Sequence, residues 1–172
     1  NVDFGDDDAI LDLSGVQGPV EFYTDGHAIG TSYNDVIITD SADVIVSGGD
    51  GNDILGFTQN WIDGSFNPDF GKFYGGAGSD TFYMGLTSYG HIVSLPDFDP
   101  AEDHIILSPS NVGKGLIGYA IKQDFDPYGN ELTLTYYNTS YPGNESKIIL
   151  PDGLDVSAIQ DAITIDDPLP DW

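Results

Sequence analysis

Along much of the chain, a large apolar residue recurs two positions after an aspartate. In the clearest copies Leu55 follows Asp53 and Phe82 follows Asp80. Weaker copies repeat only the aspartate and its apolar partner: Asp8 with Ile10, Asp35 with Ile37, and Asp43 with Ile45. One apolar side chain at a fixed place among polar neighbours predicts a short strand that turns this side chain into a core.

Glycines precede the aspartate in the two clear copies. Residues 48–56 and 75–83 both read G-G-x-G-x-D-x-U-x, where U is the large apolar residue. Glycine at three of the first four positions allows positive φ angles and adds little bulk. Such a turn can direct its carbonyl oxygens toward a cation, and the aspartate adds a charged oxygen. Two copies of so specific a pattern are unlikely by chance.

This nonapeptide is the repeat of the calcium-binding parallel β-roll. The chain therefore resembles the RTX (repeats-in-toxin, haemolysin-type) family of secreted calcium-binding proteins. Residues 97–108 are also similar to the D-F-x-x-x-x-D-x-I-x-L-S segment that closes such a roll. The resemblance implies an all-β fold: a short parallel β-roll, then a C-terminal antiparallel cap with one short helix. Residues 132–136 and 147–150 fit strands of a cap hairpin, and residues 154–163 fit the helix.

The 172 residues form one domain, large enough to bury a core. We expect N-terminal edge strands in 1–29, the roll in 30–108 and the cap in 109–172.

The spacing of the aspartates predicts where they lie on the roll. A roll with nine residues per half-turn has 18 residues per full turn. Asp35 and Asp53 are 18 residues apart, whereas Asp53 and Asp80 are 80 − 53 = 27 apart. Either Asp80 lies on the opposite side of the roll, or a nine-residue insertion bulges out near 60–72. The insertion is favoured because Trp61, Phe66, Pro68 and Phe70 do not fit a roll strand. Asp43 is out of step with both aspartates.

The resemblance also implies the metal ligands. Asp35, Asp53 and Asp80 would give carboxylate oxygens, with Asp43 as a weaker candidate. The sites would be completed by backbone carbonyls of the two glycine turns: Gly48, Gly49, Asp50 and Gly51 in one, and Gly75, Gly76, Ala77 and Gly78 in the other. The side chains of Asn34, Asp50 and Asn52 are possible extra ligands. Oxygen-only sites suit Ca²⁺ better than Mg²⁺, which demands a tight octahedron. Asp97, Asp99 and Asp103 would bind one further Ca²⁺ where roll meets cap; the alternative is a simple turn at Asp99-Pro100.

Composition agrees with this interpretation. The net charge is −25, with only four basic residues, and Asp makes up 25 of the 29 acidic ones. Dominance of Asp over Glu fits tight turns and short-armed oxygen ligands. The charge should destabilise a metal-free fold, and it argues against nucleic acid or an anionic membrane as a partner. A general adaptation to salt would explain the charge but not the glycine register. With no cysteine, metal would have to supply the cross-links.

Motifs for catalysis are missing, so we expect no enzyme within these residues. The zinc motif H-E-x-x-H of RTX proteases and the G-x-S-x-G nucleophile turn are both absent. His27, His91 and His104 lack zinc spacing. Residues 113–118 spell G-x-G-x-x-G, but no helix can follow, and a flexible loop between cap strands fits better. Exposed aromatic residues could stack on carbohydrate, although plain packing is the simpler explanation.

The resemblance implies a bacterial protein that is secreted or displayed at the cell surface, by a type I route. The module would fold on binding extracellular Ca²⁺ and support secretion and folding of a larger protein. The alternative is a processed structural subunit of a surface layer, adhesin or filament. The chain starts with Asn and ends apolar-then-acidic, unlike the usual secretion signal, which favours a processed product or a piece of a larger chain. Calcium could also promote self-association through the aspartate-rich residues 1–13; a solvated face of a monomer is the alternative.

Overall fold

The structure is a computed structural model that describes residues 10–39, 44–57, 70–85, 92–108, 116–126, 129–138 and 145–165. Short strands dominate these segments. In chain order the elements are β1 (Ile10–Asp12), β2 (Glu21–Thr24), β3 (His27–Ile29), β4 (Val36–Thr39), β5 (Ile45–Asp50), β6 (Ile54–Phe57), β7 (Phe70–Ala77), β8 (Thr81–Gly85), β9 (Ile92–Ser94), β10 (His104–Ser108), β11 (Leu116–Asp126), β12 (Gly129–Asn138), β13 (Glu145–Leu150), α1 (Val156–Asp161) and β14 (Ile163–Ile165).

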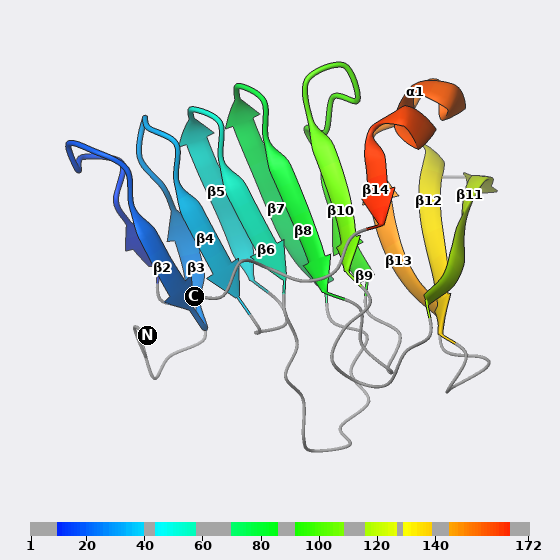
Figure 1. The fold of residues 1–172 in the computed structure, drawn as a ribbon, viewed down its shortest axis with the longest axis horizontal. Coiled ribbons are helices and arrows are strands. Elements are labelled where there is room, and N and C mark those ends of the chain that lie inside the picture. The colour runs from blue at the N-terminus through cyan, green and yellow to red at the C-terminus, as the bar shows by residue number, and fades with distance from the viewer. Residues whose placement is uncertain are drawn as a thin grey trace.

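From β1 to β10, successive strands alternate between two sheets that face each other (Figure 1). The eight-stranded sheet has the order β1-β3-β5-β7-β9-β13-β12-β11, and the six-stranded sheet has the order β14-β10-β8-β6-β4-β2. From β1 to β10 every pairing within a sheet is parallel. Because the chain changes sheets at each step, connections from the larger to the smaller sheet share one edge of the roll. Connections in the other direction share the opposite edge. This is a parallel β-roll, and the expected fold class is confirmed.

The register places Asp80 directly beside Asp53. Ile54 pairs with Thr81 in the six-stranded sheet, and Ile45 pairs with Lys72 in the other, each a step of 27 residues. Of the two alternatives in the sequence, Asp80 therefore lies on the same side as Asp53. The extra residues fall between β6 and β7, at positions 58–69, outside the described segments. Phe70 belongs to strand β7, so the expectation that it lies outside the roll strands was wrong.

The core between the sheets is built from one or two apolar side chains per strand. Ile37, Leu55 and Phe82, the partners of Asp35, Asp53 and Asp80, are fully buried, as the repeat predicted. Ile45 and Ile10 are 47% and 60% exposed, so the same prediction was wrong for two of the three weaker copies. Val44 and Val46 are buried in place of Ile45, because strand side chains alternate and Asp43 is out of step with the repeat.

The roll ends in a cap that combines antiparallel strands with one last coil. β12 pairs with β11 and β13 in antiparallel register, which includes the expected hairpin between residues 132–136 and 147–150. β13 then joins β9 in parallel, and the chain returns through α1 to pair β14 with β10. The Asp155 side chain caps α1 by accepting from the backbone amides of Ser157 and Ala158. Gly118 lies in strand β11, so the expectation of a loop at residues 113–118 was wrong for its C-terminal part.

The N-terminal strands also belong to the roll, since β1 pairs with β3 and β2 with β4 in parallel. Among the described strands, β1 and β2 are the outermost strands of the two sheets at this end. Residues 1–9, which carry most of the aspartates expected to govern self-association, lie outside the described segments. None of the helices in the described segments is long and apolar enough to cross a membrane.

Candidate metal centre

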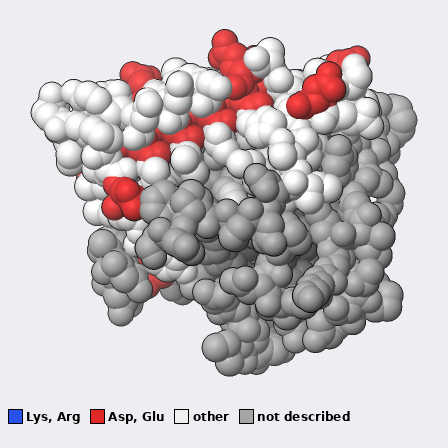
Figure 2. Space-filling model, viewed as in Figure 1, with Lys and Arg blue, Asp and Glu red and all other residues white. Residues whose placement is uncertain are grey.

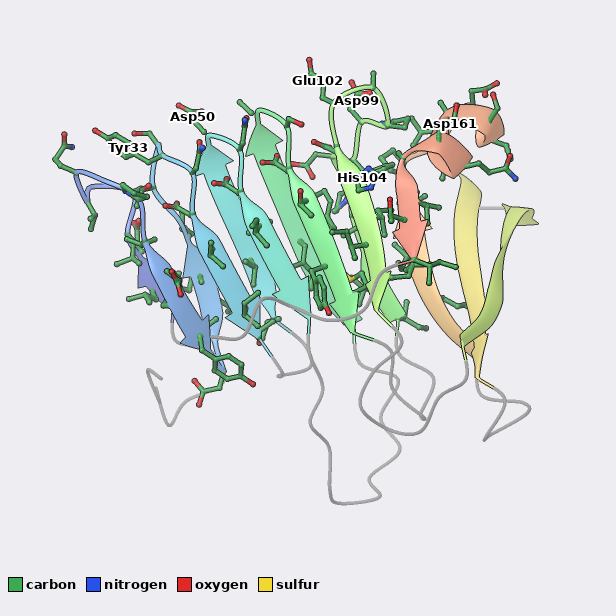
Figure 3. All side chains as sticks on the ribbon, in the orientation of Figure 1. Tyr33, Asp50, Asp99, Glu102, His104 and Asp161 are labelled. Atoms are coloured by element: carbon green, nitrogen blue, oxygen red, sulfur yellow. The ribbon has the colours of Figure 1, made fainter. Side chains whose placement is uncertain are left out.

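The connections from the eight-stranded to the six-stranded sheet stack as a row of turns along one edge of the roll. They include residues 30–35 after β3, 48–53 from the end of β5, 75–80 from the end of β7 and 95–103 after β9. Figure 3 shows Tyr33 on the first of these turns, Asp50 on the second, and Asp99 and Glu102 on the fourth, all along this edge. The glycine-rich motifs of the sequence are therefore neighbours in space.

Four buried aspartates run through these turns, one per turn, and we call them the aspartate ladder: Asp35, Asp53, Asp80 and Asp103. Their exposed fractions are 1%, 1%, 1% and 8%, respectively. Each carboxylate accepts, through Oδ1, a hydrogen bond from the backbone amide one coil earlier. The donors and distances are Val20 to Asp35 at 2.8 Å, Asp35 to Asp53 at 2.8 Å, Asp53 to Asp80 at 2.8 Å and Asp80 to Asp103 at 3.0 Å. The aspartates thus fix the register between coils as well as carrying charge.

The hydrogen bonding of the second carboxylate oxygen, Oδ2, differs between the middle of the ladder and its ends. Oδ2 of Asp53 and Oδ2 of Asp80 are buried and have no hydrogen-bond partner. A buried carboxylate oxygen without a partner is costly, and a bound cation would satisfy it. A metal ion bound beside these two oxygen atoms would supply the partner that they lack.

The glycine turns leave room beside these two oxygens. A Cβ atom on Gly48 would collide with Asp53 Oδ2 and would lie 2.7 Å from the carbonyl oxygen of Gly75. A Cβ atom on Gly75 would collide in the same way with Asp80 Oδ2. Carboxylate and carbonyl oxygens therefore lie close together around Gly48, and both are hard ligands of the kind that Ca²⁺ takes. The residues present fit the metal that the motif implies.

Backbone packs directly on backbone between neighbouring turns. Gly49 and Gly76 have φ angles of +113° and +97°, which side-chain-bearing residues rarely adopt. A Cβ atom on Gly49 would strike the carbonyl oxygen of Thr31, and one on Gly76 would strike that of Gly49. The second glycine of each motif is thus required both by its conformation and by the close approach of the turn beside it.

The electrostatics of the ladder reflect its burial. Burial raises the pKa of Asp53 to about 7, against the opposing effect of the Asp35 amide, and the charges of Asp80, Asp35 and Asp50 raise it further. Burial likewise raises the pKa of Asp80 and of Asp103. Acidic side chains cross the face drawn in Figure 2 in a line, and no described lysine appears on that face. A divalent cation at the ladder would offset this concentration of negative charge.

Asp35 differs from the two middle aspartates although its sequence position is equivalent. Its Oδ2 accepts from the backbone amide of Thr31 at 2.5 Å, and its Oδ1 accepts from the Thr31 hydroxyl at 2.9 Å. Both oxygens of this expected ligand are therefore satisfied by the chain itself. Thr31 stands where the other turns have Gly49 and Gly76, and this departure from the repeat was the signal in the sequence that could have identified it.

Asp97, Asp99 and Asp103 do not converge as the expected three-carboxylate site. Asp97 accepts from the amides of Gly75 and Gly76 at 3.2 and 3.0 Å. Asp103 Oδ2 accepts from the Asp99 amide at 2.9 Å, and Asp99 Oδ1 accepts from that of Ala101 at 2.9 Å. The geometry is that of a closed turn, the alternative the sequence left open. Across the described residues, no three Asp, Glu, His or Cys side chains are grouped to hold a metal.

The asparagines expected as extra ligands instead link one turn to the next. Asn34 Oδ1 accepts from the Asn52 amide at 2.9 Å, and Asn52 Oδ1 accepts from the Ser79 amide at 3.0 Å. The carbonyl of Ala77 accepts from the Gly51 amide at 2.8 Å. Asp50 is exposed on the turn edge. Asp43 lies outside the described residues.

Comparison with known proteins supports the fold. No protein-family model and no curated protein matches the chain. Among solved structures, the fold is similar to the solution structure of the AlgE6R3 subunit from the Azotobacter vinelandii mannuronan C5-epimerase. The TM-score is 0.52 and the identity 23%, over 88% of this chain and 81% of that one. At this identity the likeness shows a shared fold.

Proposed function

We propose that this chain is a calcium-binding module of the RTX type, and that Asp53 and Asp80 are its central ligands. The observation that carries the proposal is the pair of buried, unpartnered Oδ2 atoms beside Gly48 and Gly75. The carbonyl oxygens of the two glycine turns would supply further ligands. A flexible set made only of oxygen atoms favours Ca²⁺ over Zn²⁺, which prefers nitrogen and sulfur, and over Mg²⁺.

Binding would be coupled to folding. With a net charge of −25 and two unpaired buried carboxylates, the metal-free roll is opposed by repulsion and by desolvation. An ion that binds the folded turns and not the unfolded chain adds its binding free energy to stability. The module would therefore stay poorly folded at low calcium and fold where calcium is abundant, as outside a bacterial cell.

The biological role that follows is assistance to the secretion and folding of a larger protein, with binding rather than catalysis as the task of these residues. The similar solved structure is described as a subunit of an enzyme, which favours a module attached to a larger chain. A structural subunit of a surface layer, adhesin or filament is the alternative that the sequence left open. The parent polypeptide decides between them, since a catalytic domain in it would exclude the structural role.

Calcium titration tests the binding proposal. Circular dichroism and melting temperature are followed from calcium-free buffer to millimolar calcium, and calorimetry gives the number of ions bound. We expect calcium to raise the melting temperature and increase strand signal. Asp53→Asn and Asp80→Asn should each reduce the number of ions bound, whereas Asp152→Asn, an exposed site away from the ladder, should leave it unchanged. Identical melting curves with and without calcium would refute the proposal.

A further inference from the structure

The two ends of the aspartate ladder are closed by the chain's own donors, while its middle is open. At the N-terminal end, Thr31 donates through both its backbone amide and its hydroxyl to the Asp35 carboxylate. At the C-terminal end, the Asp99 amide donates to Asp103 Oδ2. Only Asp53 and Asp80 among the four ladder carboxylates keep an oxygen without a partner.

We propose that Thr31 replaces calcium in the turn of residues 30–35, so that this turn takes no ion and is already formed in the metal-free protein. The inference rests on the proposed calcium binding at Asp53 and Asp80, and it assigns the metal requirement to those two turns. In the turn of residues 48–53 the position of Thr31 is taken by Gly49. Gly49 has no hydroxyl to donate to Oδ1, and its amide does not bond Asp53 Oδ2, which stays unpaired, whereas the Thr31 amide donates to Asp35 Oδ2. The two turns differ at three positions, and of these Thr31 is the one that donates to the Asp35 carboxylate.

Burial strengthens the hydrogen bonds by which Thr31 takes the place of calcium. Thr31 and Asp35 are 4% and 1% exposed, so water does not compete for the two hydrogen bonds. The Thr31 hydroxyl also accepts from the Tyr33 amide at 3.0 Å, which holds the turn in shape. Hydrogen bonds to an ionised carboxylate are about twice as strong as neutral ones, so the Asp35 charge is compensated without a cation.

A turn formed in advance would order its neighbour. The Asp35 amide donates to Asp53 Oδ1, and Asn34 Oδ1 accepts from the Asn52 amide. Both bonds join the turn of residues 30–35 to the first turn expected to bind metal. The Thr31 turn therefore provides a fixed surface on which the turn of residues 48–53 assembles when calcium arrives.

Thr31→Gly tests the inference, because it restores the double glycine of the other turns. In calcium, we expect this variant to bind one ion more than the wild type. Asp35→Asn in the wild-type background should leave the number of ions unchanged, and in the Thr31→Gly background it should remove the additional ion. Ser32→Gly, at an exposed position of the same turn, controls for added backbone freedom.

Hydrogen exchange of the calcium-free protein gives a second measurement that does not depend on ion binding. The amides of Val20 and Thr31 should be protected in the wild type and in Thr31→Ser, and lose at least tenfold protection in Thr31→Gly. Equal ion numbers in wild type and Thr31→Gly, or a lost ion in Asp35→Asn, would overturn the inference. A wild type that binds no calcium but protects these amides would refute the proposed function and leave the closed turn standing.

Discussion

The backbone amide of Asp53 donates to Oδ1 of Asp80 at 2.8 Å, although 27 residues separate them. The same bond joins Asp35 to Asp53 across 18 residues. In Asp53 and Asp80 the carboxylate therefore has two tasks: one oxygen fixes the position of the neighbouring coil, and the other, which has no hydrogen-bond partner, would bind a cation. Mutations at these residues should affect stability in opposite directions with and without calcium.

Asp53→Asn should change the stability of the protein in opposite directions with and without calcium. The amide oxygen can still accept from the Asp35 amide, and the buried unpaired charge is gone, so the calcium-free protein should become more stable at pH 7.5. In calcium the same variant should melt below the wild type, since a ligand with full negative charge is lost. Melting temperatures of both proteins in both conditions check this. A variant that melts lower than the wild type in both conditions would contradict it.

Stability of the calcium-free protein should rise on acidification below neutral pH. The pKa of Asp53 is about 7 in the fold, against 3.8 for an ordinary aspartate. Between these values the folded protein holds a proton that the unfolded chain has released, so lowering the pH favours the fold. The slope is about 1.4 kcal/mol per pH unit for one such group. The raised pKa values of Asp80 and Asp103 act in the same direction.

Calcium should reverse this pH dependence, because the ion requires the ionised carboxylate and protons compete with it. Calcium affinity should therefore fall from pH 7.5 to pH 5.5, and binding near pH 6.5 should release protons. Calorimetry in two buffers of different ionisation enthalpy measures the number released. A calcium affinity independent of pH over this range would contradict the prediction, and Asp53→Asn should release fewer protons.

Gly76→Ala should prevent close stacking of the turns. The new side chain meets both an unfavourable φ angle and the carbonyl oxygen of Gly49. Gly18→Ala is the matched control, since Gly18 also has a positive φ, of +128°, but nothing lies within 4 Å of the position that its Cβ atom would take. The conformational cost alone is about 1–3 kcal/mol, so Gly76→Ala should lose more than Gly18→Ala in chemical unfolding. Equal losses would show that stacking contributes nothing.

Phe98→Ala should destabilise the junction between roll and cap. Phe98 is 2% exposed and packs edge-on against Phe82, with ring centroids 6.0 Å apart and an interplanar angle of 65°. Removing such a buried ring costs about 3–5 kcal/mol. The comparison is Ile45→Ala, 47% exposed in strand β5, which should cost less than about 1 kcal/mol. Denaturant unfolding in saturating calcium measures both.

The repeat predicted best where its full pattern is present. Leu55 and Phe82 were placed in the core because glycines, aspartate and apolar residue follow one pattern in both copies. Asp80 was placed on the side of Asp53 because residues near 60–72 were interpreted as an insertion. Ile45 failed because a single aspartate-apolar pair does not say which face of a strand is buried. The short strand β14 was not predicted, because its three β-branched residues are too short a run to identify a strand, which forms here by pairing with β10.

For the candidate site, the sequence identified the turns that carry the buried aspartates but not the hydrogen bonds of each carboxylate. Asp35 and Asp53 occupy equivalent positions and look alike in the repeat. What separates them is a hydrogen bond from Thr31 across the turn, which depends on the folded geometry. In the same way, Asp97 was expected to be a ligand because of the family resemblance, and the sequence did not show that its carboxylate accepts from the amides of Gly75 and Gly76 in the fold.

The aspartate ladder lies at one edge of the roll and the longest added segment at the other, and this has a consequence for protein engineering and for sequence divergence. Steps between ladder aspartates are 18, 27 and 103 − 80 = 23 residues, yet the hydrogen-bonded ladder continues without a break. The largest difference in length is taken up between β6 and β7, at the edge away from the carboxylates. We therefore expect that peptides of other lengths inserted between β6 and β7 would leave the hydrogen-bonded ladder intact, which would make the module a scaffold for displaying peptides.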